Sequence, residues 1–74
     1  MQAVFKPIGL LKTYTQGDVT LSFDAPITIR HGLHQIVIPA DLVALVLVNG
    51  KQATKDTPLN DNDEIQLIAV LGGG

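Results

Sequence analysis

The stretch LVALVLVNG, residues 42–50, constrains the fold of this 74-residue chain most strongly. Its first seven residues are all apolar. Such a run is typical of a strand covered on both faces, so we expect it to be central in a sheet. Asn49-Gly50 follows, and this dipeptide favours a type I′ turn because both residues tolerate positive φ. The stretch therefore predicts a hairpin, with residues 51–54 as the returning strand.

The segment before this hairpin has the pattern of one amphipathic helix. Thr28 is a suitable N-cap, because its hydroxyl can accept a hydrogen bond from a free N–H of the first turn. An apolar stripe at helical spacing follows, made of Ile29, Leu33 and Ile36. Gly32 lies inside this helix and predicts a close-packing site. Pro39 is expected to end the helix, because the residue before a proline is pushed towards extended geometry.

Three further strands are expected on either side of these elements. Residues 3–8 suit a pleated surface, with Pro7 near the strand end because it cannot donate to a ladder. Residues 19–23 alternate between apolar and polar and predict an antiparallel partner for the first strand. Residues 64–70 predict the last strand. Strands clustered around one helix indicate an α+β fold.

Composition narrows the function classes. The chain has no cysteine and two histidines, so thiolate metal sites and disulfides are excluded and no metal site is expected. A net charge of −2, without a basic stripe, argues against nucleic acid as a partner. Residues 42–48 are too few to span a bilayer, and the first residues lack a signal-peptide pattern, so we expect a cytoplasmic protein with no membrane partner.

Four motifs together resemble the MoaD/ThiS family of ubiquitin-like sulfur carrier proteins. They are IPADL at 38–42, VLVNG at 46–50, TPLNDNDEI at 57–65 and the final Gly73-Gly74. The resemblance implies a β-grasp fold, in which a mixed sheet of four to five strands packs on one helix. It also implies one domain over residues 1–71 and a flexible glycine tail over residues 72–74.

The chain departs from the family pattern at two points. Asn62 stands where the family usually has glycine, but asparagine also tolerates the left-handed conformation, so the turn is expected to persist. The chain ends in three glycines rather than two. The long first segment, including residues 8–12, resembles the MoaD branch more than the shorter ThiS branch.

The resemblance places the chemistry at the terminal carboxylate of Gly74. In this family a partner adenylylates that carboxylate with ATP, and sulfur then displaces AMP to leave a thiocarboxylate. Gly72 and Gly73 would allow the tail into a narrow active site, because glycine has no Cβ and adopts nearly any φ/ψ. The chain itself would be a carrier and co-substrate rather than an enzyme. It would bind no cofactor, and its activating partner would use the ATP and magnesium.

The implied partners are proteins. They are an adenylylating enzyme of the ubiquitin-activating type, a sulfur donor, and an acceptor synthase. In the MoaD branch the acceptor is the large subunit of molybdopterin synthase, and in the ThiS branch it is thiazole synthase. The exposed side of the sheet beside the root of the tail is the natural docking surface. The candidate contacts are Phe5, Leu59, Leu67, Ala69 and Leu71, and the first three also suit a hydrophobic core.

Two alternatives stay open at this point. The same terminus could form isopeptide bonds to lysine in a ubiquitin-like modifier, or the chain could be a β-grasp interaction module with an incidental glycine tail. Two local features have ordinary structural interpretations as well. The acidic residues Asp56, Asp61, Asp63 and Glu64 suit either a surface that steers a basic partner or a self-bonded turn. His31 and His34 are expected to be solvent-facing helix residues.

Overall fold

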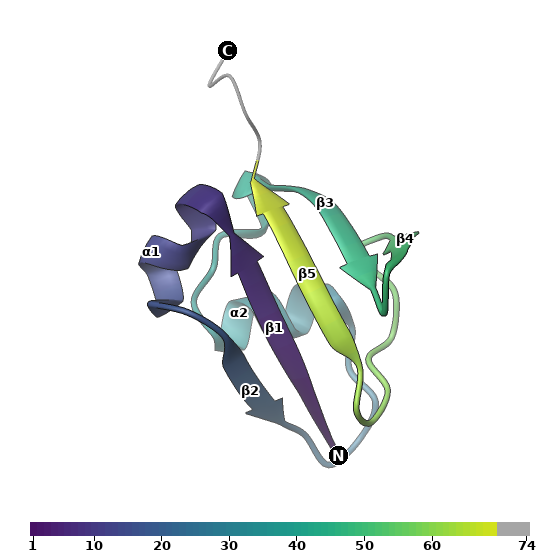
Figure 1. Ribbon diagram of the computed structural model, residues 1–74. Helices are drawn as coiled ribbons and strands as arrows, with labels where there is room; N and C mark the ends of the chain where they lie inside the picture. Colours follow the sequence, from purple (N-terminus) through teal and green to yellow (C-terminus); the bar gives the residue numbers. More distant parts are fainter. Residues whose placement is uncertain (70–74) are drawn as a thin grey trace.

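The computed structural model describes residues 1–69 (Figure 1). Within that range the chain forms five strands, two short helices and two 3₁₀ turns. In chain order they are β1 (Gln2–Ile8), η1 (Gly9–Leu11), α1 (Lys12–Thr15), β2 (Val19–Ser22), α2 (Ile29–Gln35), η2 (Ala40–Leu42), β3 (Val43–Val48), β4 (Lys51–Ala53) and β5 (Glu64–Ala69). The strands form one sheet in the order β2-β1-β5-β3-β4. The predicted mixed sheet packed on one helix is confirmed.

The core lies between the sheet and α2, which covers one face of the sheet (Figure 1). Period-2 alternation sends one side of each strand into this layer. In β1 the buried residues are Ala3, Phe5 and Pro7, and in β5 they are Ile65, Leu67 and Ala69. From α2, Ile29 and Leu33 contribute fully buried side chains, as the predicted apolar stripe requires.

Gly32 occupies the closest contact between α2 and the sheet. A Cβ built on it would lie 2.7 Å from Cζ of Phe5 and 3.3 Å from methyl carbons of Leu21 and Leu59. No side chain has room there, because protein interiors are close-packed. The prediction of a close-packing site at this residue is confirmed.

The central strand is β5, not β3. β5 pairs in parallel with β1 and antiparallel with β3, so it has a neighbour along both edges. β3 pairs with β4 over its last three residues only. Its side chains alternate between the core, as at Val46, and the uncovered face, as at Leu45 and Leu47. The prediction of a central strand covered on both faces was therefore wrong: the second face is apolar but not covered by residues 1–69.

The end of α2 also differs from the expectation. Thr28 caps the start as predicted, with its hydroxyl oxygen 3.1 Å from the N–H of His31. The helix stops at Gln35, before the influence of Pro39, because Val37 adopts a left-handed φ of 62°. The N–H of Val37 then donates to the carbonyl of His34, and that of Ile38 to the carbonyl of Leu33. This is a Schellman motif formed without the usual glycine.

Pro7 lies one residue before the end of β1, as expected. The N–H of Val4 donates to Asp63 on the β5 side. Because N–H groups alternate in direction along a strand, the nitrogen of Pro7 points towards the β2 side. The pairing with β2 reaches only as far as Phe5. The missing donor of the proline therefore costs no ladder hydrogen bond.

Asn49 joins the predicted hairpin to the start of β5. Asn49 and Gly50 have φ values of 52° and 87°, which confirms the turn expected from this dipeptide. The side chain of Asn49 accepts from the N–H of Glu64 and donates to the carboxylate of Asp63, both at 2.9 Å. The other Asp63 oxygen accepts from the N–H of Asn60 at 2.8 Å. These hydrogen bonds link the hairpin turn to the acidic block that precedes the last strand, so the two motifs depend on each other.

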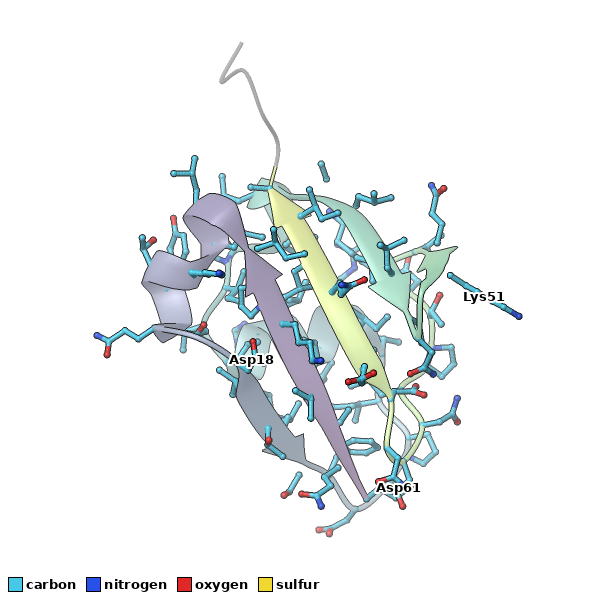
Figure 2. All side chains as sticks on the ribbon, viewed as in Figure 1. Asp18, Lys51 and Asp61 are labelled. Atoms are coloured by element: carbon cyan, nitrogen blue, oxygen red, sulfur yellow. The ribbon has the colours of Figure 1, made fainter. Side chains whose placement is uncertain are left out.

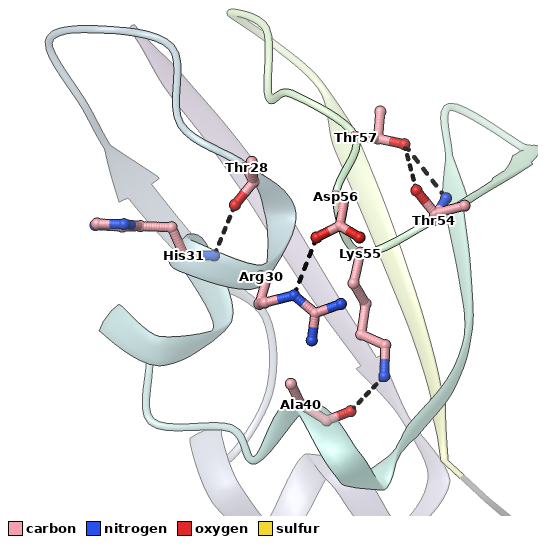
Figure 3. Close-up of polar contacts among 8 residues, drawn as sticks. All are labelled: Thr28, Arg30, His31, Ala40, Thr54, Lys55, Asp56 and Thr57. Atoms are coloured by element: carbon pink, nitrogen blue, oxygen red, sulfur yellow. Dashed lines mark hydrogen bonds and ion pairs between the residues drawn. The ribbon is translucent and has the colours of Figure 1, made fainter.

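The connection between β4 and β5 is tied to α2 and η2 (Figure 3). Arg30 Nε donates to Asp56 Oδ1 at 3.1 Å, and Lys55 Nζ donates to the carbonyl of Ala40 at 2.8 Å. The backbone N–H of Ile29 also donates to the carbonyl of Thr57. The helix layer is thus fixed against this connection by both backbone and side-chain contacts.

Candidate functional site

The end of β5 is the last described point before the terminus that the sequence predicts to be functional. Ala69 is its last described residue, and η1 and η2 lie at the same end of the molecule (Figure 1). The predicted tail residues Gly72, Gly73 and Gly74, and the predicted contact Leu71, lie outside the described residues. The site is therefore built here from the surfaces that surround the end of β5.

An apolar row crosses the uncovered face of the sheet at this end. Ile8 of β1 and Leu45 of β3 are both register partners of Ile68 in β5. Ile8 is 39% exposed, and the other two side chains are partly exposed. The face carrying these residues is opposite α2 (Figure 1). We call this face, with Leu47 beside the row, the open face.

The open face becomes polar farther from the end of β5. Lys6 pairs in register with Gln66, and its Nζ lies 2.8 Å from Glu64 Oε1. The hydrogen bond to Glu64, followed by the charge of that carboxylate, raises the pKa of Lys6 above its ordinary value. Side chains on this face project towards the viewer in Figure 2, where Asp18, a weaker influence on Lys6, is labelled. The face therefore has an apolar half beside the chain end and a charged half beyond it.

Three predicted docking residues are corrected. Phe5, Leu59 and Leu67 are 0% exposed and belong to the core. Their side chains point into the helix layer, so they cannot contact a partner of the folded protein. The predicted surface, the exposed side of the sheet near the last strand, exists, but different residues form it.

The residues of the open face were missed because their strands were not assigned a buried side. A signal was present in the sequence. Once Phe5 and Pro7 are placed in the core, period-2 alternation puts Ile8 on the other face. In the same way, a buried Val46 places Leu45 and Leu47 on the open face. Apolar residues at these alternate positions are therefore candidates for a docking surface.

The predicted acidic residues each have a specific partner. Asp63 is 7% exposed and bonded to Asn49 and Asn60. Asp61 Oδ1 accepts from the N–H of Gln2 at 2.8 Å, and it lies at the turn beside the N-terminus (Figure 2). Asp56 and Glu64 form the two ion pairs described above. These contacts support the self-bonded turn rather than a surface that steers a basic partner.

The two histidines do not form part of a metal site among residues 1–69. His31 and His34 are exposed, and Nε2 of His31 lies 3.0 Å from the side-chain nitrogen of Gln35. Among residues 1–69, no group of three or more potential metal-ligating side chains comes together. In the same range, none of the helices has the length and apolar character needed to cross a membrane.

A family model connects the sequence to known proteins. The model described as the ThiS family matches residues 8–74, which include the hairpin, the acidic block and the glycine terminus. Among curated proteins, no sequence matches this chain significantly.

Solved structures share the architecture at low sequence identity. SAMP1 from Haloferax volcanii superposes with a TM-score of 0.75 at 19% identity, with both chains fully covered. A second structure, small archaeal modifier protein 1 from H. volcanii, gives the same TM-score and identity over 92% of this chain and 95% of that one. A putative molybdopterin converting factor, subunit 1, from Pyrococcus furiosus gives 0.74 at 12% identity, over 93% and 97%. These likenesses establish the β-grasp fold.

Proposed function

Because the chain belongs to the ThiS family, a group of small carrier proteins, we propose that it carries sulfur as a thiocarboxylate on Gly74. The carboxylate oxygen of Gly74 attacks the α-phosphorus of ATP, and pyrophosphate leaves. Hydrosulfide released by the donor then attacks the acyl carbon, AMP leaves, and the thiocarboxylate remains. The partner enzyme supplies the ATP site and the magnesium, and the chain supplies the acyl group. The observation that carries this proposal is the family match, which runs to the terminal residue.

Two features of the described residues support this function: the anchoring of β5 in the sheet and the position of the open face. β5 lies between β1 and β3, so the segment leading to Gly74 starts from the most firmly paired strand of the sheet. The apolar half of the open face lies at the same end, where an activating enzyme would hold the body while the terminus reacts. Holding the body this way turns the reaction of the terminus into an effectively intramolecular step. Gly72 and Gly73 would admit the terminus to the partner's active site.

The acceptor would be a synthase that uses the sulfur in cofactor biosynthesis. Two acceptors fit the family, the large subunit of molybdopterin synthase and thiazole synthase. The P. furiosus neighbour is named for molybdopterin conversion, which favours testing that acceptor first. Each synthase would engage the same open face, so activation and sulfur delivery would be successive rather than simultaneous.

A second candidate function is protein modification through the same terminus. The H. volcanii neighbours are named as modifier proteins, and one of them matches over the full length of both chains. In this function a lysine amine of a target attacks the activated acyl carbon of Gly74, AMP leaves, and an isopeptide bond forms. The open face and the tail would serve activation in the same way.

Intact-mass analysis separates these functions. The protein is incubated with ATP, magnesium, its activating enzyme and a sulfur donor. We expect a mass gain equal to the exchange of one oxygen for one sulfur. Lysine-linked adducts on other proteins would instead favour the modifier. No change, with an enzyme verified on a known substrate, would contradict both and favour an interaction module.

Deleting Gly74 provides the matched control for that experiment. The variant is expected to lose the mass gain completely, because its new terminus is one residue shorter than the active site requires. Its melting temperature should stay within about 1 °C of the parent, since glycine has no side chain to pack in a core. A large fall in melting temperature would show that the terminus is structural.

A further inference from the structure

Strand β2 forms one edge of the sheet and pairs only with β1 (Figure 1). The N–H of Phe23 donates to the carbonyl of Met1 at 2.8 Å, and this bond sets the phase of the ladder between the two strands. Because backbone groups alternate in direction along a strand, those of Thr20 and Ser22 point away from β1. Neither of these two N–H groups donates to another residue within 1–69. The N–H and C=O groups of both residues therefore form an outward row.

The edge of β2 lacks the features that usually protect a sheet edge. Natural sheets guard their edges with lysine and other charged residues, proline or bulges. Residues Val19–Ser22 include no charge and no proline, and their register with β1 is continuous. The opposite edge strand, β4, has only three residues and begins with Lys51. An extended segment could therefore add to β2 as a further strand, held by backbone hydrogen bonds.

The charges at the two ends of β2 indicate what kind of segment would bind. Asp18 precedes the strand and Asp24 follows it, and neither forms an ion pair with a described residue. Figure 2 shows Asp18 at the start of β2. The cation that Asp18 influences, Lys6, is already paired with Glu64 at 2.8 Å. A segment with one basic side chain near each end would complement the two free carboxylates.

A second copy of this chain is a poor occupant of the same edge. The antiparallel register that uses both outward N–H groups of β2 in each copy places Thr20 opposite Ser22 of the other copy. That register also places Asp18 opposite Asp24, once at each end. Like charges directly opposite each other destabilise a strand pair. The edge therefore favours a different, basic partner over self-association.

We propose that the free edge of β2 binds an extended segment of another protein, antiparallel to β2, with basic side chains opposite Asp18 and Asp24. These two residues are six positions apart, so the basic residues of the segment are six positions apart as well. Between them, apolar side chains opposite Val19 and Leu21 would continue the helix side of the sheet, and polar ones would continue the other side. The apolar row of the open face lies on β1, β5 and β3, so this contact would leave it free.

NMR titration of the full chain, labelled with ¹⁵N, tests the proposal. The probe is a capped heptapeptide, Lys-Val-Thr-Val-Thr-Val-Lys, which has this pattern. We expect the largest amide shifts at Thr20 and Ser22, and hydrogen exchange there should slow at least about tenfold at saturation, because both N–H groups gain an acceptor. The N–H of Leu21, already directed at β1, is the internal control. Shifts confined to the open face would overturn the proposal.

A second peptide tests the charge pattern. Glu-Val-Thr-Val-Thr-Val-Glu has the same shape and should bind at least about tenfold more weakly at low ionic strength. The double variant Asp18→Lys/Asp24→Lys should reverse this preference. Equal affinities for the two peptides, or an unchanged preference in the double variant, would overturn the proposal.

Backbone variants test the edge itself. Ser22→Pro removes one outward donor but no bond to β1, and should weaken binding of the lysine peptide at least about tenfold. Ser22→Thr keeps the donor and is the matched control. Equal affinities of these two variants would contradict binding through the strand edge. Amide shifts at Thr20 and Ser22 that grow with protein concentration, without peptide, would identify a second copy as the occupant and overturn the proposal.

The proposal does not depend on the chemistry of the terminus. Deleting Gly74 should abolish formation of the thiocarboxylate and leave the affinity for the lysine peptide unchanged. Ser22→Pro should do the opposite. A failure of the edge proposal is therefore distinguishable from a failure of the carrier function.

Discussion

Gly32 and Val37, five residues apart, are constrained in different ways, the first by the space for a side chain and the second by its backbone conformation. Gly32 is helical, and no side chain has room beside it. Val37 has an exposed side chain but a left-handed backbone, with φ at 62°, which β-branched residues rarely adopt. Packing therefore limits the choice of residue at position 32, and the left-handed φ limits it at position 37. Each constraint predicts a measurable effect of substitution.

Gly32→Ala is expected to destabilise the protein by up to about 2 kcal/mol. Alanine gains about 1 kcal/mol in helix propensity, but overpacking against a fully buried Phe5 costs about 1–3 kcal/mol. Urea unfolding of the purified variant measures the difference. His34→Ala, an exposed change on the same helix, should lie within about 0.5 kcal/mol of the parent. A stabilised Gly32→Ala would show that the helix can move away from the sheet at little cost.

Val37→Asn is expected to stabilise the protein by about 1 kcal/mol, because asparagine tolerates the left-handed conformation that costs other residues roughly 1–2 kcal/mol. The side chain of Val37 is 76% exposed, so little buried contact is lost. Val37→Ala is the matched control: it removes the same exposed group but keeps a residue disfavoured in this conformation, and should gain less. Equal gains in thermal unfolding would contradict the backbone explanation.

At the scale of elements, the connection between β4 and β5 holds helix α2 in place. Arg30 pairs with Asp56 across this contact, and both side chains are largely exposed (Figure 3). The hydrogen bond from Arg30, followed by its charge, lowers the pKa of the Asp56 carboxyl below its ordinary value. Such a group contributes stability above its unfolded pKa, and the contribution disappears as the pH falls through the folded pKa.

Arg30→Gln should therefore be less stable than the parent at neutral pH, by a small, salt-sensitive amount. The difference should shrink as the pH falls below about 4, because the carboxyl is protonated first in the unfolded state and only at lower pH in the folded state. Chemical unfolding from pH 7 to pH 2 measures it. Lys12→Gln, which removes the same charge from α1, should show no such convergence. A difference that persists at pH 2 would assign the effect to packing of the Arg30 side chain.

The elements also show how far the sequence predicts this fold. The helix start at Thr28, the Asn49-Gly50 turn and the order of strands follow from local chemistry and were predicted. The role of β3 was not, because a run of apolar residues looks the same whether its second face is covered by the chain or by another protein. The end of α2 at Val37 was missed for a related reason. Its left-handed backbone comes with the local hydrogen bonds that close the helix, from Val37 to His34 and from Ile38 to Leu33, against the preference of a β-branched residue.

The candidate site, too, could be predicted from the sequence only in part. The motifs predict a reactive terminus after β5 and a docking surface on the exposed side of the sheet, since both depend on element order, and both stay predictions. The individual docking residues required the phase of each strand. Phe5 and Ile8 differ only in which face they occupy, and one residue of register exchanges those faces.

At the scale of the whole molecule, the helix covers one face of the sheet and leaves an apolar row on the other. Under the proposed function, Ile8→Asp is expected to reduce the rate of adenylylation about tenfold, because a charge in the apolar row must be desolvated when a partner covers the open face. The initial rate of pyrophosphate release measures this. Val37→Asp, at a more exposed apolar position on the helix layer, is the control and should leave the rate unchanged. Equal losses would place the docking surface elsewhere.

The placement of β5 has a mechanical consequence. A partner that grips the terminus and pulls along the strand would load the pairings with β1 and β3 at the same moment. Backbone hydrogen bonds in a sheet lie across the strands, so this load acts on them in shear and not one at a time. Strand β4, which has three residues and a single neighbour, could instead be peeled away bond by bond. The fold is thus expected to resist a pulling force best when that force is applied at the C-terminal end of β5.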